Sequence, residues 1–182
     1  DTNQSLGNYY GNYFIQTFLI ALLYALLVVV ITGAGEALYR RAYPQHLSMN
    51  KIFTPTGLRT KSFLINSTLG MTLAVVFIAF QTGFYLIANR FGAWAPAEVN
   101  YSNAINTYFP WIFVLLIGFI PAVTEEFSFR LFAIPFFAKI FHSKLLAILI
   151  PALIWGFAHA NYPNQPFWIR GAEVSLFGIF VG

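Results

Sequence analysis

Cysteine is absent from the 182-residue sequence. Its absence excludes disulfide bonds, thiolate nucleophiles, thiolate-bound metals and S-acylation. Aspartate is nearly absent as well, because Asp1 is the only one, and the HExxH and GxSxG motifs do not occur. These absences disfavour zinc proteases of the HExxH type, aspartyl proteases with a membrane-embedded pair, and rhomboid-like serine proteases.

Charge is the next scarce property. Only 9% of the residues are charged and 58% are hydrophobic, whereas a soluble domain carries about 25% charged residues. Each uncharged stretch is long enough for a spanning helix of about 20 residues, and none shows the alternation of a β-barrel strand. We therefore predict an all-α, polytopic transmembrane helical bundle. The stretches without Asp, Glu, Lys or Arg are 2–35, 62–89, 99–124 and 145–169.

The net charge of +4 is concentrated in one loop. Half of the basic residues fall between positions 40 and 61, on a loop short enough for the positive-inside rule. This cluster predicts membrane orientation, with the loop in the cytoplasm, and no nucleic-acid partner. Its members are Arg40, Arg41, Lys51, Arg59 and Lys61.

We expect about five spans in this sequence and more in the full protein. The chain begins without Met and ends inside an apolar run, which predicts one transmembrane domain over 1–182 that is truncated at its C-terminus. Positions 1–106 hold N-terminal spans, and 107–182 hold the helices with the polar motifs. Lipid is an expected partner, and the expected location is a bacterial plasma membrane. The predicted spans are 14–33, 63–88, 108–141, 145–160 and a fifth from about 172.

The third span contains the stretch TEEFSFR at 124–130, between two apolar flanks. A charge at the bilayer centre costs about 2.5–3.5 kcal/mol, so these side chains need partners or a function. Glu126 and Arg130 have the i, i+4 spacing of a helical ion pair, with the acid first. On an α-helix, Glu125 lies about 100° from Glu126 and about 140° from Arg130. We predict a structural pair of Glu126 and Arg130, with Glu125 free.

His159 lies near the end of the following apolar segment. The midpoint of 125 and 159 is 142, where a turn is predicted between the two segments. At 1.5 Å per residue, both side chains lie about 25 Å along their helices from that turn. A lone histidine there often is only an interfacial residue, but its level matches that of Glu125. We therefore predict that Glu125 and His159 face each other on adjacent helices.

Three chemistries suit a carboxylate and an imidazole in a bundle that excludes water. Glu125 can act as general base on a water that His159 orients or polarises. The two side chains can also supply ligands to a divalent metal such as zinc. Finally, they can form a relay in an ion- or proton-coupled transporter.

The motifs resemble those of the CPBP family, which comprises CAAX proteases and bacteriocin-processing enzymes and is also called Abi. EEFSFR matches the EExxxR signature, and Trp155 to His159 resembles the FxxxH signature. The resemblance covers 108–182 and implies an intramembrane endopeptidase that cleaves a membrane-associated protein or peptide. It implies that Glu125 is the catalytic base, that His159 helps to activate water, and that Glu126 holds Arg130. Trp155 stands where the pattern has Phe and is expected to keep an aromatic wall.

The family's third signature, a His followed four residues later by Asn, is not found in the sequence. Asn161 and Asn164 follow His159 at the wrong spacing. We expect this signature beyond Gly182, where it would complete the oxyanion site or the metal ligands. A metal at Glu125 and His159 needs that third ligand, so we favour metal-free activation of water and keep zinc as the alternative.

Substrate and activity remain open at this level. The charge rule places the motifs nearer the outer face, whereas processing of prenylated proteins requires cytoplasmic access. Either the topology is inverted or the substrate is another peptide, such as an exported one. The alternatives to an enzyme are a transporter subunit and an inactive immunity or scaffold member of the same fold.

Overall fold

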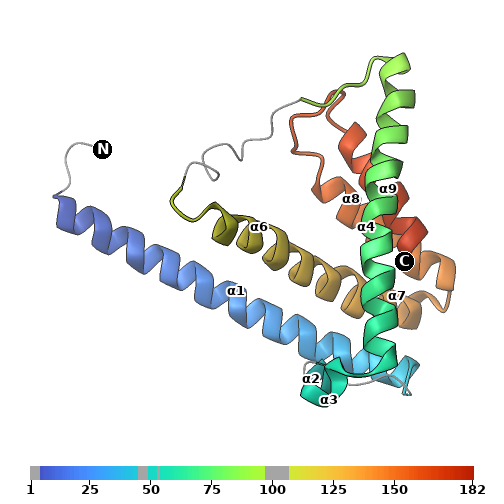
Figure 1. The fold of residues 1–182 in the computed structure, drawn as a ribbon, viewed down its shortest axis with the longest axis horizontal. Coiled ribbons are helices and arrows are strands. Elements are labelled where there is room, and N and C mark those ends of the chain that lie inside the picture. Colours follow the sequence, from blue (N-terminus) through green and yellow to red (C-terminus); the bar gives the residue numbers. More distant parts are fainter. Residues whose placement is uncertain (1–4, 45–48, 53, 97–106) are drawn as a thin grey trace.

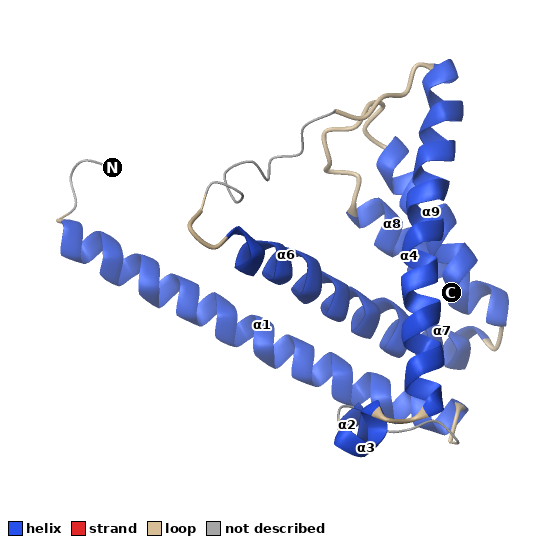
Figure 2. Ribbon diagram, viewed as in Figure 1, coloured by secondary structure: helices blue, strands red, loops and turns tan. Residues whose placement is uncertain are grey.

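The computed structural model describes residues 5–44, 49–52, 54–96 and 107–182. In these ranges all regular structure is helical, apart from one isolated antiparallel bridge between Trp94 and Gln165 (Figure 2). The predicted all-α fold is confirmed. The elements are α1 (Leu6–Ala42), α2 (Met49–Ile52), α3 (Pro55–Leu58), α4 (Lys61–Ala88), η1 (Asn89–Phe91), α6 (Pro110–Glu125), η2 (Glu126–Ala133), α7 (Ile134–Phe141), α8 (Lys144–Ala158) and α9 (Ile169–Val181).

Three helical units within the described residues are long and apolar enough to cross a membrane. They are α1, with 37 residues; the 31-residue run Lys61–Phe91; and the 32-residue run Pro110–Phe141 that α6, η2 and α7 form together. The fourth and fifth predicted spans are present as helices, but α8 has 15 residues and α9 has 13. Helix α8 is shorter than the about 20 residues of a typical span.

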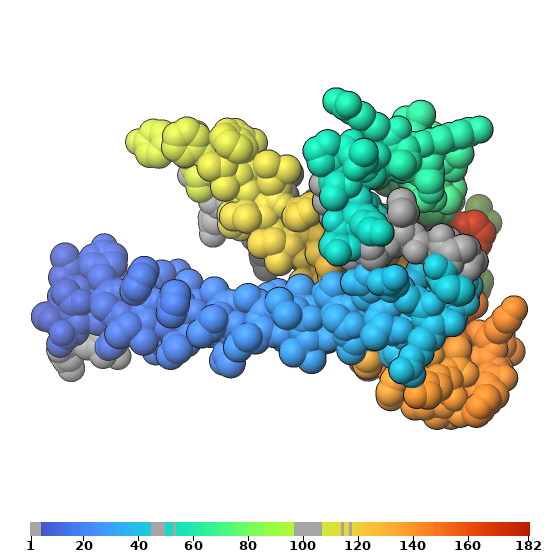
Figure 3. Space-filling view, turned by 90° about the horizontal axis from the view of Figure 1, so that it is seen from below, coloured from blue at the N-terminus to red at the C-terminus, as the bar shows by residue number. Residues whose placement is uncertain are grey.

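The long helices splay apart at one end and converge at the other. In Figure 1, α1 and α6 run in the same general direction and meet α7 near the C-terminal end of α1. The space-filling view confirms that α1 and α6 are separate rods along much of their length (Figure 3). Where they converge, Gly35 of α1 brings its backbone against η2, because a Cβ there would lie 3.1 Å from the Leu131 side chain. Close approach through small residues is typical of membrane helices.

The segment η2 is π-helical and therefore departs from the period assumed for TEEFSFR. Pro135 lies just beyond it and lacks the N–H that the Leu131 carbonyl would accept in a regular α-helix. π-Helical turns are rare and are frequent at functional sites. The predicted 140° offset between Glu125 and Arg130 is therefore wrong, because it assumed 3.6 residues per turn.

Helices α8 and α9 form the tightest interface. A Cβ on Gly156 would lie 2.0 Å from the Ser175 hydroxyl oxygen, and a Cβ on Gly178 would lie 3.0 Å from the Trp155 indole. The helix α4 joins this pair through ring contacts, with Phe77 and Phe177 centroids 4.5 Å apart. These contacts fix the helix that precedes His159 against its neighbours.

Large apolar side chains cover the outer surfaces of the long helices. Leu23 on α1 is 66% exposed and Met71 on α4 is 74% exposed. A soluble monomer rarely exposes continuous apolar patches of this size. Together with the helix lengths, these surfaces identify an integral membrane protein.

Candidate active site

Glu125 and His159 lie side by side, as their equal distances from the predicted turn at 142 indicated. Glu125 ends α6 and His159 directly follows α8, and the Glu125 Oε1 and His159 Nε2 atoms are 3.9 Å apart. The bend between the two helices is at His142, which has φ 51°, and at Ser143, whose hydroxyl accepts the Leu146 N–H. The predicted proximity is confirmed, and the catalytic role of the two residues stays a prediction.

The imidazole of His159 is oriented by its own helix. Its Nδ1 atom lies 2.8 Å from the Trp155 carbonyl oxygen. Because a carbonyl only accepts hydrogen bonds, Nδ1 carries the proton, and the lone pair of the neutral ring is on Nε2. That lone pair belongs to the atom nearest Glu125. The ring also meets the Trp155 indole edge to face, with centroids 5.6 Å apart.

Trp155 also orients the carboxylate. Its indole Nε1–H donates to Glu125 Oε2 at 2.8 Å, which leaves Oε1 as the oxygen nearest His159. Sequence reasoning assigned Trp155 only an aromatic wall and missed this bond. Two signals were available, because tryptophan has an N–H that phenylalanine lacks and because positions 155 and 159 share a helix face.

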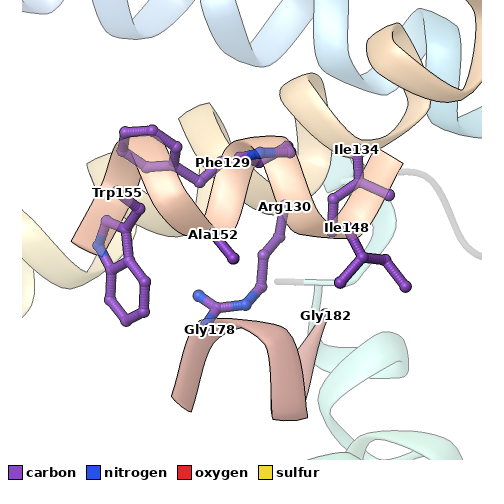
Figure 4. Close-up of a pocket in the computed structure, with 9 residues that line it drawn as sticks. Phe129, Arg130, Ile134, Ile148, Ala152, Trp155, Gly178 and Gly182 are labelled. Carbon is purple, nitrogen blue, oxygen red and sulfur yellow. The ribbon is translucent and has the colours of Figure 1, made fainter. Parts of the chain in front are cut away.

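Arg130 pairs with Glu126 and not with Glu125. The Arg130 Nη1 donates to Glu126 Oε1, so the predicted pairing is present. The guanidinium carbon of Arg130 also lies 5.0 Å from the centroid of the Trp155 ring, a distance typical of a cation–π contact. Figure 4 shows the Arg130 side chain reaching from η2 toward Gly178 on α9. The pair thus holds η2 against α8 and α9 beside the Glu125–His159 pair.

Comparison with known protein families gives a match to this part of the chain. Residues 107–182 match the family model described as type II CAAX prenyl endopeptidase Rce1-like. We call residues 107–182 the Rce1-like region. No curated protein and no solved structure matches the chain. The Rce1-like region contains every residue of the two predicted motifs. The match is therefore consistent with the resemblance to CAAX proteases that was drawn from those motifs.

A large open cavity borders the Rce1-like region at η2 and α7. It has a volume of about 1340 Å³ and is lined by α1, the start of α4, η2 and α7. Glu126 and Arg130 line it, whereas Glu125 and His159 do not. The two adjacent glutamates therefore have different surroundings, with Glu126 at the cavity and Glu125 at the imidazole.

The described part of the Rce1-like region offers two donors to a metal. Glu125 Oε1 and His159 Nε2 are atoms of the kinds that zinc binds, but a catalytic zinc site uses three protein ligands. No group of three His, Cys, Asp or Glu side chains suited to a metal occurs among the described residues. Glu125 and His159 would supply two of the ligands that such a site needs.

Proposed function

We propose that this protein is an intramembrane endopeptidase in which Glu125 and His159 activate the attacking water. The observation that carries the proposal is the 3.9 Å separation of Glu125 Oε1 and His159 Nε2. One water with hydrogen bonds of about 2.8 Å fits between two such atoms. The match to an endopeptidase family over residues 107–182 supports the same reaction class.

In the proposed reaction, the bridging water donates one hydrogen bond to each of the two side chains. Glu125 Oε1 removes a proton as the water oxygen attacks the carbonyl carbon of the scissile peptide bond. A tetrahedral intermediate forms, and its C–N bond then breaks. Glu125 returns the proton to the leaving amine, so the products are a carboxylic acid and an amine. His159 accepts the second hydrogen bond at Nε2 and orients the water.

Trp155 and the Glu126–Arg130 pair have supporting roles in this proposal. The Trp155 carbonyl holds the tautomer of His159, and its indole holds Glu125 Oε2. Groups that fix reacting atoms within a fraction of an ångström lower the barrier because less motion is lost at the transition state. Arg130 supports the Trp155 ring from η2.

The substrate class that we propose is a membrane-associated protein or peptide, and a prenylated C-a-a-X terminus is the first candidate because the family description names it. Cleavage of a prenylated protein would require the inverted topology. We place the protein in a bacterial plasma membrane. The test uses purified full-length protein in lipid vesicles and a fluorogenic farnesylated peptide that spans the C-a-a-X segment. The same peptide without the farnesyl group tests whether the lipid chain is needed.

We expect cleavage by the wild-type protein and none by Glu125→Gln or His159→Gln, with normal abundance of both variants. Full activity in Glu125→Gln would contradict the mechanism. If neither peptide is cleaved, comparison of membrane proteins between cells with wild-type protein and cells with Glu125→Ala tests for another substrate. An identical set of processed proteins in both would favour the inactive scaffold.

A further inference from the structure

A second charged pair is buried beside the candidate active site. Arg170, in the first turn of α9, donates from Nη1 to both carboxylate oxygens of Glu173 at 2.8 Å. Glu173 is 0% exposed. No role was predicted for either residue, although their i, i+3 spacing is visible in the sequence. A buried ion pair is weak evidence for stability, because desolvation offsets its attraction, so its position suggests another role.

The pair reaches His159 through one aromatic ring. The Arg170 guanidinium carbon lies 5.6 Å from the centroid of the Tyr162 ring. Tyr162 in turn stacks on the His159 imidazole, with centroids 5.8 Å apart and an interplanar angle of 22°. Glu173 therefore fixes Arg170, Arg170 contacts Tyr162, and Tyr162 covers the imidazole.

The loop that carries Tyr162 is also held from α4. Asn164 is 6% exposed, and its Nδ2 donates to the hydroxyl of Tyr85. Tyr85 also interacts with Glu173. Glu173 thus connects to the loop on two sides, through Arg170 and through Tyr85. His159 needs this support, because it lies just after α8 and begins that loop.

We propose that Arg170 and Glu173 are positioning residues that hold the His159 ring through Tyr162. Neither residue touches the reacting atoms, and both act on the direction in which Nε2 points. The inference rests on the proposed function in one respect, namely that the position of Nε2 matters because it orients the water. A role limited to docking α9 on the bundle is the alternative that the experiment must separate.

The first test compares Glu173→Gln with the double variant Arg170→Gln, Glu173→Gln. The single change leaves a buried cation without its partner and is expected to reduce the amount of folded protein. The double change removes both charges and is expected to restore folding. If the pair positions His159, kcat of the folded double variant stays about 10- to 100-fold low, as is typical for groups that orient a reacting side chain. Recovery of wild-type kcat together with folding would overturn the proposal.

Tyr162 provides a matched pair of variants that leaves both charges in place. Tyr162→Phe keeps the ring, and its kcat is expected to stay within about threefold of wild type. Tyr162→Leu removes the stack and is expected to lower kcat by about tenfold or more, with KM little changed. Equal kcat values for the two variants would contradict positioning through the ring, even if the double variant does not fold.

A third readout does not depend on proteolysis. The ¹⁵N signals of the His159 imidazole are assigned in lipid vesicles by comparison with His159→Gln. Wild-type protein and Tyr162→Phe are expected to give one Nδ1-protonated ring, whereas Tyr162→Leu and the double variant give broadened or multiple ring signals. Unchanged ring signals in Tyr162→Leu would overturn the positioning role. If the wild-type ring is ordered but neither the peptides nor any membrane protein is cleaved, the proposed function fails while the positioning role stands.

Discussion

The indole N–H of Trp155 provides the sharpest test of the site geometry. Trp155→Phe keeps an aromatic ring and the backbone carbonyl that holds His159, and it removes the donor to Glu125 Oε2, 2.8 Å away. It also puts a smaller ring against Arg130 and His159. A hydrogen bond to a charged group contributes about 1.5–3 kcal/mol. If all of this energy positions the carboxylate in the transition state, kcat falls by about 10- to 100-fold, because each 1.36 kcal/mol is a factor of ten.

The assay measures kcat and KM for the farnesylated fluorogenic peptide in lipid vesicles, with folding followed by circular dichroism melting. Trp111→Phe is the matched control, because it makes the same chemical change at a residue on α6 that is 60% exposed. We expect the control to retain wild-type kcat. Two results would refute the reasoning: wild-type kcat in Trp155→Phe, or a loss of activity that only follows the loss of folded protein.

Three further predictions concern stability and metal dependence. Glu126→Gln leaves Arg130 without its carboxylate and should reduce the free energy of unfolding by about 1–3 kcal/mol. This loss is smaller than for a fully buried pair, because the Glu126 side chain is 54% exposed. An unchanged melting temperature would contradict the prediction. Gly156→Ala should destabilise the protein by about 1–3 kcal/mol, since its Cβ would lie 2.0 Å from the Ser175 hydroxyl oxygen. The control Gly70→Ala should not destabilise it, because a Cβ there would meet nothing within 4 Å. Equal melting temperatures for the two variants would refute the prediction. Full-length protein treated with chelator and dialysed should keep its activity, and stoichiometric zinc that disappears together with activity would overturn the metal-free mechanism.

Several features follow from the sequence alone. Low charge and long apolar runs predict membrane helices, because a helix is the form that satisfies every backbone hydrogen bond within one segment in lipid. The pairing of Glu126 with Arg130 was predicted from their i, i+4 spacing, and the pair forms although η2 is π-helical. The proximity of Glu125 and His159 follows from equal distances to a turn, and this argument survives the π-helical segment because it depends on level along the helices.

Other features were decided by packing. The hydrogen-bond register of η2 is not encoded in hydrophobic periodicity, so the angular argument for Glu125 and Arg130 was wrong. The same holds for the direction of the Trp155 indole, which depends on Gly178 leaving room for the ring beside α9.

The Arg170–Glu173 pair marks the limit of sequence reasoning most clearly. Its spacing is local, but the complete burial of Glu173 results from α4, α8 and α9 coming together. Burial turns an ordinary helical ion pair into one whose partners must be placed accurately, because an unpaired charge is costly where water is excluded. Composition and spacing thus determine which helices form and which residues share a level, whereas contacts between helices decide which atoms of Glu125 and His159 face each other.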